Sequence, residues 1–151
     1  MTLKISRLLL KPSPGNVAIE FALVALIWAF LMLGVCDFGL AINCRSQVEG
    51  AAAAGVEWVS ANSSQYSNTG AQNAAKNSTA LPISAVASSF HGCPNGNGIT
   101  TQNSGTTCAS FGATPVGTYA TVTTSYTYHP ISLLFGSSSV TFSATATTRY
   151  Q

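Results

Sequence analysis

Residues 17–42 read "VAIEFALVALIWAFLMLGVCDFGLAI", an apolar run that is interrupted only by Glu20 and Asp37. At a rise of about 1.5 Å per residue the run reaches roughly 39 Å, which exceeds the hydrocarbon core of a bilayer, about 30 Å thick. A buried core helix is the alternative, but no other segment of the chain is apolar enough to surround a helix that is apolar on all faces. The run therefore predicts a single transmembrane helix over residues 16–42, and a carboxylate near its start needs a functional explanation.

The composition also favours a membrane protein. The chain has 151 residues, enough for one compact unit, and only 7% of them are charged, whereas about 25% are charged in a typical soluble domain. Three of the basic residues precede the apolar run: Lys4, Arg7 and Lys11. Because positive charge stays on the cytoplasmic side, we expect a cytoplasmic N-terminus and a distal part beyond the membrane.

Beyond residue 15 the charge changes sign, because the remainder has three basic and four acidic residues. This balance gives no basic surface for nucleic acid.

The N-terminus has three interpretations: an uncleaved anchor, a cleaved secretory signal, and a leader that is cut on the cytoplasmic side of the span. A secretory signal needs small residues in an A-x-A-like pattern after its apolar region, and "VCDFGLAIN" fits this pattern poorly. A lipoprotein signal ending at Cys36 would need a small residue where Val35 stands. The third interpretation fits residue by residue, since a cut after Gly15 makes Asn16 the first residue and Glu20 the fifth.

A short basic leader, a glycine, a glutamate at the fifth position and the stretch "VAIEFALVAL" together resemble the TadE-like minor pilins of bacterial tight-adherence (Tad) pili. The resemblance covers about 30 residues strongly and the C-terminal "TATTRY" loosely. Two positions differ from the family pattern: Pro14 replaces a basic residue before the glycine, and Leu26 replaces a proline, which predicts a straighter helix.

The resemblance implies a structural subunit. It implies cleavage by a prepilin peptidase between Gly15 and Asn16, pairing of Glu20 with the freed α-amino group, and contacts with other pilin subunits, the pilus assembly platform and the lipid bilayer. It places the protein in the bacterial inner membrane, with a periplasmic C-terminal domain and a possible location in the extracellular pilus.

The fold class that we expect is α+β, with the long N-terminal helix extending into a small distal domain. Residues 43–80 form a helical extension, in which the first helix continues to about Ser60 and a second short helix covers 71–80. A stripe of small and β-branched residues recurs at helical spacing: Val48, Ala52, Gly55, Val56 and Val59. This stripe indicates either a slim face for another helix or simply the high helix propensity of alanine.

Residues 81–151 predict a small β-containing domain. The segments 118–128 and 139–149 read as strands of an antiparallel hairpin, and a third strand near 84–90 would stabilise them. One face of the 139–149 strand is apolar and is expected to pack against the helix.

The four cysteines are not equivalent. Cys93 and Cys108 enclose a surface loop and predict a disulfide in an oxidising compartment. A zinc site that adds His91 and His129 is the alternative, but its spacing matches no compact zinc pattern. Two cysteines in the first helix cannot bridge each other, because eight residues of helix separate them by about 12 Å. Cys36 and Cys44 are therefore free thiols or contacts to another chain, with packing the simpler interpretation for Cys36.

The sequence contains no candidate catalytic residues. After the apolar run the only carboxylates are Glu49 and Glu57, and the "DFG" at 37–39 lacks every other kinase element. We expect a structural protein rather than an enzyme, with no cofactor, no metal and no small-molecule substrate. The alternative function is an uncleaved, membrane-anchored periplasmic binding module that uses the Ser/Thr/Asn-rich loops.

Overall fold

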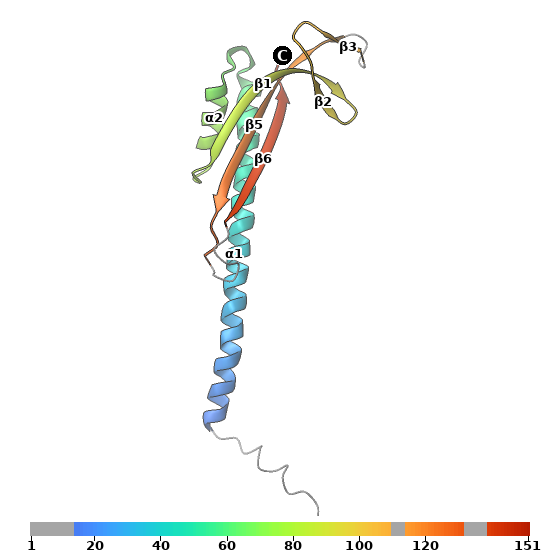
Figure 1. Ribbon diagram of the computed structural model, residues 1–151. Coiled ribbons are helices and arrows are strands. Elements are labelled where there is room, and N and C mark those ends of the chain that lie inside the picture. The colour runs from blue at the N-terminus through green and yellow to red at the C-terminus, as the bar shows by residue number, and fades with distance from the viewer. Residues whose placement is uncertain (1–13, 110–113, 132–138) are drawn as a thin grey trace, which may run out of the picture.

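The computed structural model describes residues 14–109, 114–131 and 139–151. A single long helix, α1 (Pro14–Ala61), carries a small domain on its second half (Figure 1). After a 3-10 turn at Ser63–Gln65, the second helix α2 (Asn68–Asn77) runs beside α1, and the strands follow. The α+β architecture predicted from the sequence is thus confirmed.

Helix α1 continues without a break through residue 42, where the sequence predicted the end of the membrane segment, and ends near the expected residue 60. Proline at the first helical position suits its start, since that position needs no donor. At the other end Asn62 closes the last turn, because its backbone N–H and its side-chain amide both donate to the Trp58 carbonyl, at 3.0 and 2.9 Å.

Helix α2 begins three residues earlier than the expected 71–80 and ends earlier too. Ser67 acts as its N-cap, and the side-chain oxygen accepts a hydrogen bond from the Gly70 N–H at 3.0 Å. A serine at this position satisfies one of the donors that a helix start leaves unpaired. The expected boundaries were wrong because they followed the alanines and overlooked this cap.

The main sheet has four antiparallel strands in the order β2-β1-β5-β6. Their bounds are β1 Ser84–Asn95, β2 Gly98–Thr101, β5 Gly117–Tyr128 and β6 Val140–Arg149. The predicted hairpin corresponds to β5 and β6, and the predicted third strand to β1. Strand β2 lies inside the segment 93–108 that the sequence predicted to be loop, and so does β3 (Thr107–Cys108), which pairs with β4 (Thr114–Pro115).

The two faces of the β5–β6 pair differ. The outer face carries cross-strand threonine pairs, such as Thr121 with Thr147 at 2.9 Å and Thr123 with Thr145 at 3.1 Å between hydroxyl oxygens. On the inner face of β6, Phe142, Ala144 and Ala146 are partly buried, as the alternation of apolar residues predicted, whereas Val140, the first apolar residue of the same face, is 46% exposed. The sheet therefore presents hydroxyl groups outward and packs its apolar face on α1.

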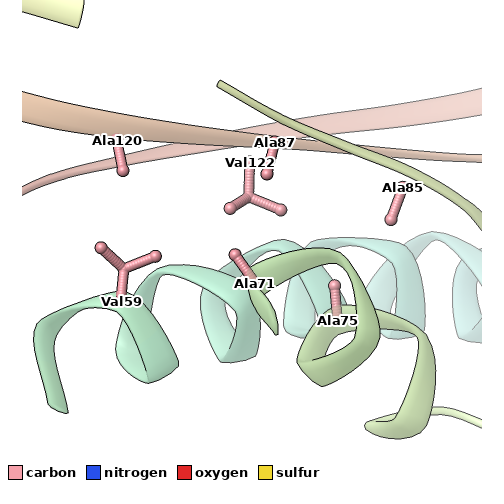
Figure 2. Packing of buried hydrophobic residues seen from close by; sticks show 7 residues of the cluster. All are labelled: Val59, Ala71, Ala75, Ala85, Ala87, Ala120 and Val122. Atoms are coloured by element: carbon pink, nitrogen blue, oxygen red, sulfur yellow. The ribbon is translucent and has the colours of Figure 1, made fainter. Parts of the chain in front are cut away.

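The core between the sheet and the two helices consists mostly of small side chains (Figure 2). It comprises Val59, Ala71, Ala75, Ala85, Ala87, Ala120 and Val122. In Figure 2 the side chains from the strands point toward those from the two helices. Because alanines bring backbones close together, the helices and the sheet form a thin, closely packed layer.

Gly55 shows how closely these elements approach. A Cβ atom at Gly55 would lie 2.8 Å from Cγ1 of Val122 and 3.3 Å from the carbonyl oxygen of Ala71. The small-residue stripe of α1 therefore packs against the sheet and α2 of the same chain. Of the two interpretations that the sequence left open, close packing holds for this stripe, with its own domain as the partner.

Candidate functional site

The predicted cleavage site lies at the start of α1. Gly15 and Asn16 are both helical, in the first turn after Pro14. The basic leader residues Lys4, Arg7 and Lys11 lie outside the described residues. The structure therefore places the Gly15–Asn16 bond at the end of the apolar segment, and cleavage there stays a prediction.

Glu20 lies one helical turn after Asn16 and is exposed on α1. It is the only charged residue of the segment 17–36. Among the described residues no basic group forms a salt bridge with it, and the ion pair found on α1 joins Arg45 Nε to Glu49 Oε1 at 2.9 Å.

The helix around Glu20 exposes apolar side chains on all sides. The large exposed residues of this segment include Phe21, Leu26, Trp28, Met32 and Val35, with exposed fractions between 56% and 73%. One helix in the described part of the chain, within Val17–Ala61, is long and apolar enough to cross a membrane, and none of its most apolar stretch is buried in the chain. This segment could therefore be a single membrane span.

Asp37 marks the point where the exposed segment ends and the sheet begins to cover α1. Its side chain is only 3% exposed. The carboxylate oxygen Oδ1 accepts hydrogen bonds from the Tyr128 hydroxyl at 3.1 Å and from the Ile131 N–H at 2.9 Å. These bonds attach the end of β5 and the start of the β5–β6 connection to α1.

The same contacts affect Tyr128. Burial, and then the hydrogen bond to the nearby Asp37 carboxylate, raise the pKa of Tyr128 above its ordinary value. The hydroxyl therefore stays protonated and available as a donor over the physiological range.

Asp37 is not among the site residues that the sequence predicts, where it is only an interruption of the apolar run and part of a "DFG" without other kinase elements. The available signal was the same one that drew attention to Glu20: an acid next to a long apolar segment is costly unless it has a partner. The partner, Tyr128, is 91 residues away in the sequence and could not be chosen without the fold.

A second polar contact attaches the sheet to α1 higher along the helix. The buried hydroxyl of Thr124 donates to the Val48 carbonyl oxygen at 2.8 Å. A carbonyl oxygen can accept two hydrogen bonds, so the Val48 carbonyl can accept from Thr124 and still take part in the helix. The buried hydroxyl is thereby satisfied. Asp37 and Thr124 together hold β5 along the helix at two heights.

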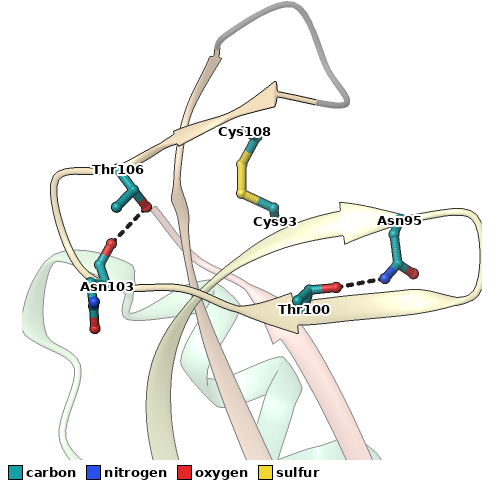
Figure 3. The surroundings of a disulfide bond; sticks show 6 residues. All are labelled: Cys93, Asn95, Thr100, Asn103, Thr106 and Cys108. Carbon is teal, nitrogen blue, oxygen red and sulfur yellow. Dashed lines mark hydrogen bonds between the residues drawn. A yellow bond between two sulfur atoms is a disulfide. The ribbon is translucent and has the colours of Figure 1, made fainter.

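Cys93 and Cys108 form a disulfide at the far end of the domain, with Cα atoms 5.5 Å apart (Figure 3). It joins the end of β1 to β3. Because both thiols are used, the zinc alternative with His91 and His129 is wrong. In the described ranges no group of three His, Cys, Asp or Glu side chains could hold a metal ion.

The two cysteines of α1 differ in environment. Cys44 is buried against the domain, whereas Cys36 is exposed at the end of the apolar segment. The expected packing of Cys36 is therefore wrong within the single chain, because the sheet covers α1 only from Asp37 onward.

The N-terminal helix matches a known protein family. Residues 15–57 match the family model described as TadE-like protein. No curated protein and no solved structure matches the chain. The matched segment begins at the predicted cleavage glycine, contains Glu20 and Asp37, and lies entirely within α1. Through this N-terminal helix the protein resembles the TadE-like, pilin-like proteins of tight-adherence pili.

Proposed function

We propose that the protein is a minor pilin, or pseudopilin, of a tight-adherence pilus that serves surface attachment. A prepilin peptidase removes residues 1–15, α1 holds the subunit in the inner membrane, and the processed subunit enters or primes the filament. The observation that supports this most strongly is the TadE-like match over a helix whose apolar half is exposed on all sides and carries one carboxylate.

The role proposed for Glu20 follows from the cost of an unpaired carboxylate in lipid, which amounts to several kcal/mol. Cleavage after Gly15 frees the α-amino group of Asn16, which is an ammonium near neutral pH with an ordinary pKa of about 8. Residues four apart on a helix are neighbours, so this ammonium can pair with Glu20 in the same chain or in an adjacent subunit. The pair neutralises both charges and sets the axial position of one helix against the next.

The proposal assigns the domain beyond residue 36 a structural role. Its contacts are packing, a disulfide and hydrogen bonds that hold the sheet on α1. The partners in this proposal are the prepilin peptidase, other pilin subunits, the assembly platform and the bilayer.

The proposal is tested first by the intact mass of the protein from cells with and without the prepilin peptidase. Loss of residues 1–15 only when the peptidase is present is the expected result. An unchanged mass would support the uncleaved, membrane-anchored binding module instead.

The orientation is tested by a reporter that is active only in the periplasm, fused after Gln151. We expect activity, since the basic leader keeps the N-terminus in the cytoplasm. A reporter active only on the cytoplasmic side would contradict the orientation.

Glu20→Gln tests the pairing. The variant should insert in the membrane and be processed, but its amount in sheared pili should fall well below that of the wild type. Glu57→Gln is the matched control, because Glu57 is an exposed glutamate on the same helix beside the sheet. Normal recovery of processed Glu20→Gln protein in pili would show that the pairing role is wrong.

A further inference from the structure

The end of the sheet nearest to the apolar segment carries exposed apolar side chains. Ile131, just after β5, is 74% exposed, and Val140, the first residue of β6, is 46% exposed. Beside them on α1, Phe38 is 66% exposed. Phe38, Val140 and Phe142 line an apolar groove between α1 and the sheet, next to Asp37. We call Phe38, Ile131 and Val140 the junction patch.

The height of the junction patch along α1 follows from the helix geometry. The 20 residues from Val17 to Cys36 rise roughly 30 Å, which equals the thickness of the hydrocarbon core. Asp37 therefore lies at the far boundary of the hydrocarbon if the apolar segment spans it. Its hydrogen bonds to Tyr128 and Ile131 hold the end of the sheet at this same height. In Figure 1, β5 ends and β6 begins beside the middle of α1.

The junction patch is also continuous with the apolar surface of the helix below it. Val35, two residues before Asp37, is 69% exposed, and Phe38 follows immediately after Asp37. The Asp37 carboxylate and the Tyr128 ring are turned inward at this point, since both residues are buried. A surface that keeps its carboxylate inside and its apolar side chains outside is suited to lipid and not to water.

We infer that the junction patch is a second membrane contact, which rests on the interfacial region of the periplasmic leaflet and sets the depth of α1. The inference rests on the proposed membrane span and goes beyond it, because a span alone requires no contact between the sheet and lipid. Ile131, which Asp37 holds at this height, lies at the boundary between the acyl chains and the headgroups, and Phe38 and Val140 face the same interfacial region. Asp37 is a positioning residue, since it acts by holding Tyr128 and Ile131.

The test uses the full-length protein in vesicles of phosphatidylethanolamine and phosphatidylglycerol. An environment-sensitive fluorophore is attached at Ile131→Cys or, as a matched control, at Thr147→Cys, which is exposed on the outer face of β6. The background carries Cys36→Ala and Cys44→Ala so that only the new thiol reacts, and the disulfide stays oxidised. Nitroxide lipids that carry the spin label near the headgroup or at the acyl-chain end quench the fluorophore according to its depth.

We expect the label at position 131 to shift to shorter wavelength and to be quenched mainly by the headgroup nitroxide, and the label at position 147 to show neither effect. Equal solvent exposure of both labels would overturn the inference. A shift at 131 without nitroxide quenching would also overturn it, since a second copy of the chain would then cover the patch. Stronger quenching by the chain-end nitroxide would overturn the interfacial depth.

The membrane span has its own readout in the same sample. Trp28 lies in the apolar segment and is 60% exposed, and Trp58→Phe removes the other tryptophan. Quenching of Trp28 by the chain-end nitroxide together with a solvent-exposed label at 131 would reject the second contact and leave the span intact. Absence of quenching at Trp28 would reject the span itself.

Discussion

The two halves of α1 share one continuous helix but meet their surroundings in opposite ways. From Val17 to Cys36 the large side chains are exposed on every side, with Trp28 at 60%. From Asp37 to Ala61 one stripe is buried, and Val48 and Val59 are at most 1% exposed. The second half has its packing partner within the chain, whereas none of the described residues covers the first half. A continuous helix can therefore serve both as a domain core and as a segment that requires a membrane or other subunits.

Each half also contains one tryptophan, which allows the halves to be measured separately. Trp28 lies in the exposed half, and Trp58 packs against the core beside Gly70. Variants that carry Trp28→Phe or Trp58→Phe therefore report on one half at a time, in the full chain in detergent micelles.

Loss of the disulfide should have the largest effect and should be confined to the packed half. Replacing Cys93 and Cys108 by serine frees a loop with a sequence separation of 15 residues and should lower the free energy of unfolding by about 3 kcal/mol. Denaturation followed through Trp58 should shift, and the Trp28 signal should not. Cys36→Ser is the control. Non-reducing peptide mapping should link the peptides that contain Cys93 and Cys108, and recovery of both as free thiols from exported protein would contradict the prediction.

The second largest difference between the two halves of α1 should come from a larger side chain, which only the packed half has no room for. Gly55→Val forces atoms into Val122 and the Ala71 carbonyl, and overpacking of this kind should cost about 2 kcal/mol. Gly34→Val is the matched control, because a Cβ atom at Gly34 would meet nothing within 4 Å in the single chain. The Trp58-reported midpoint should fall only for the Gly55 variant. Equal loss in both variants would show that the halves do not differ in packing.

The junction between the halves depends on Asp37. Asp37→Asn removes the charge that accepts from the Tyr128 hydroxyl and the Ile131 N–H, and should cost about 1 kcal/mol. Glu49→Gln on the exposed face of the same helix should cost less, since a surface i,i+4 ion pair such as Arg45–Glu49 contributes at most about 0.5 kcal/mol. Protection of the Ile131 amide against hydrogen exchange should fall in Asp37→Asn alone. Unchanged protection would show that Asp37 does not hold this end of the sheet.

The smallest effect should come from pH. The pKa of Tyr128 is raised in the folded protein, so the contribution of this group to stability is fully present below about pH 10 and is lost as the pH rises from there through the folded-state pKa. Tyr128→Phe should reduce this loss of stability at alkaline pH. Part of the loss should remain, because burial also raises the pKa of Tyr66. The midpoint followed through Trp58 across the alkaline range measures the difference. An identical alkaline slope in Tyr128→Phe and the wild type would contradict the proposed environment of Tyr128.

Sequence reasoning was most successful where the signal is local. The long helix, its end near residue 60, the three principal strands and the pairing of Cys93 with Cys108 all agree with the structure. The start of α2 was misplaced because a single capping residue, Ser67, determines it. Strand β2 was missed because its residues 98–101 read as part of a glycine- and asparagine-rich loop and become a strand only by pairing with the end of β1.

Of the two acidic residues of the candidate site, one could be predicted from the sequence and the other could not. Glu20 could be selected from the sequence because its unusual feature, a charge inside an apolar run, depends only on its neighbours in the chain. Asp37 has the same feature, but its role depends on Tyr128 and Ile131, which reach it only through the register of β5 on α1.

The sequence by itself determined that residues 17–36 form a helix that is apolar on all faces, because length and hydrophobicity are properties of the segment alone. Only the tertiary structure decided which face of the next turns is covered and by what. The physical reason is that the small residues of α1, such as Gly55, permit close approach by any helix or sheet. The choice of partner, the chain's own sheet and α2, is made by contacts between residues far apart in the sequence.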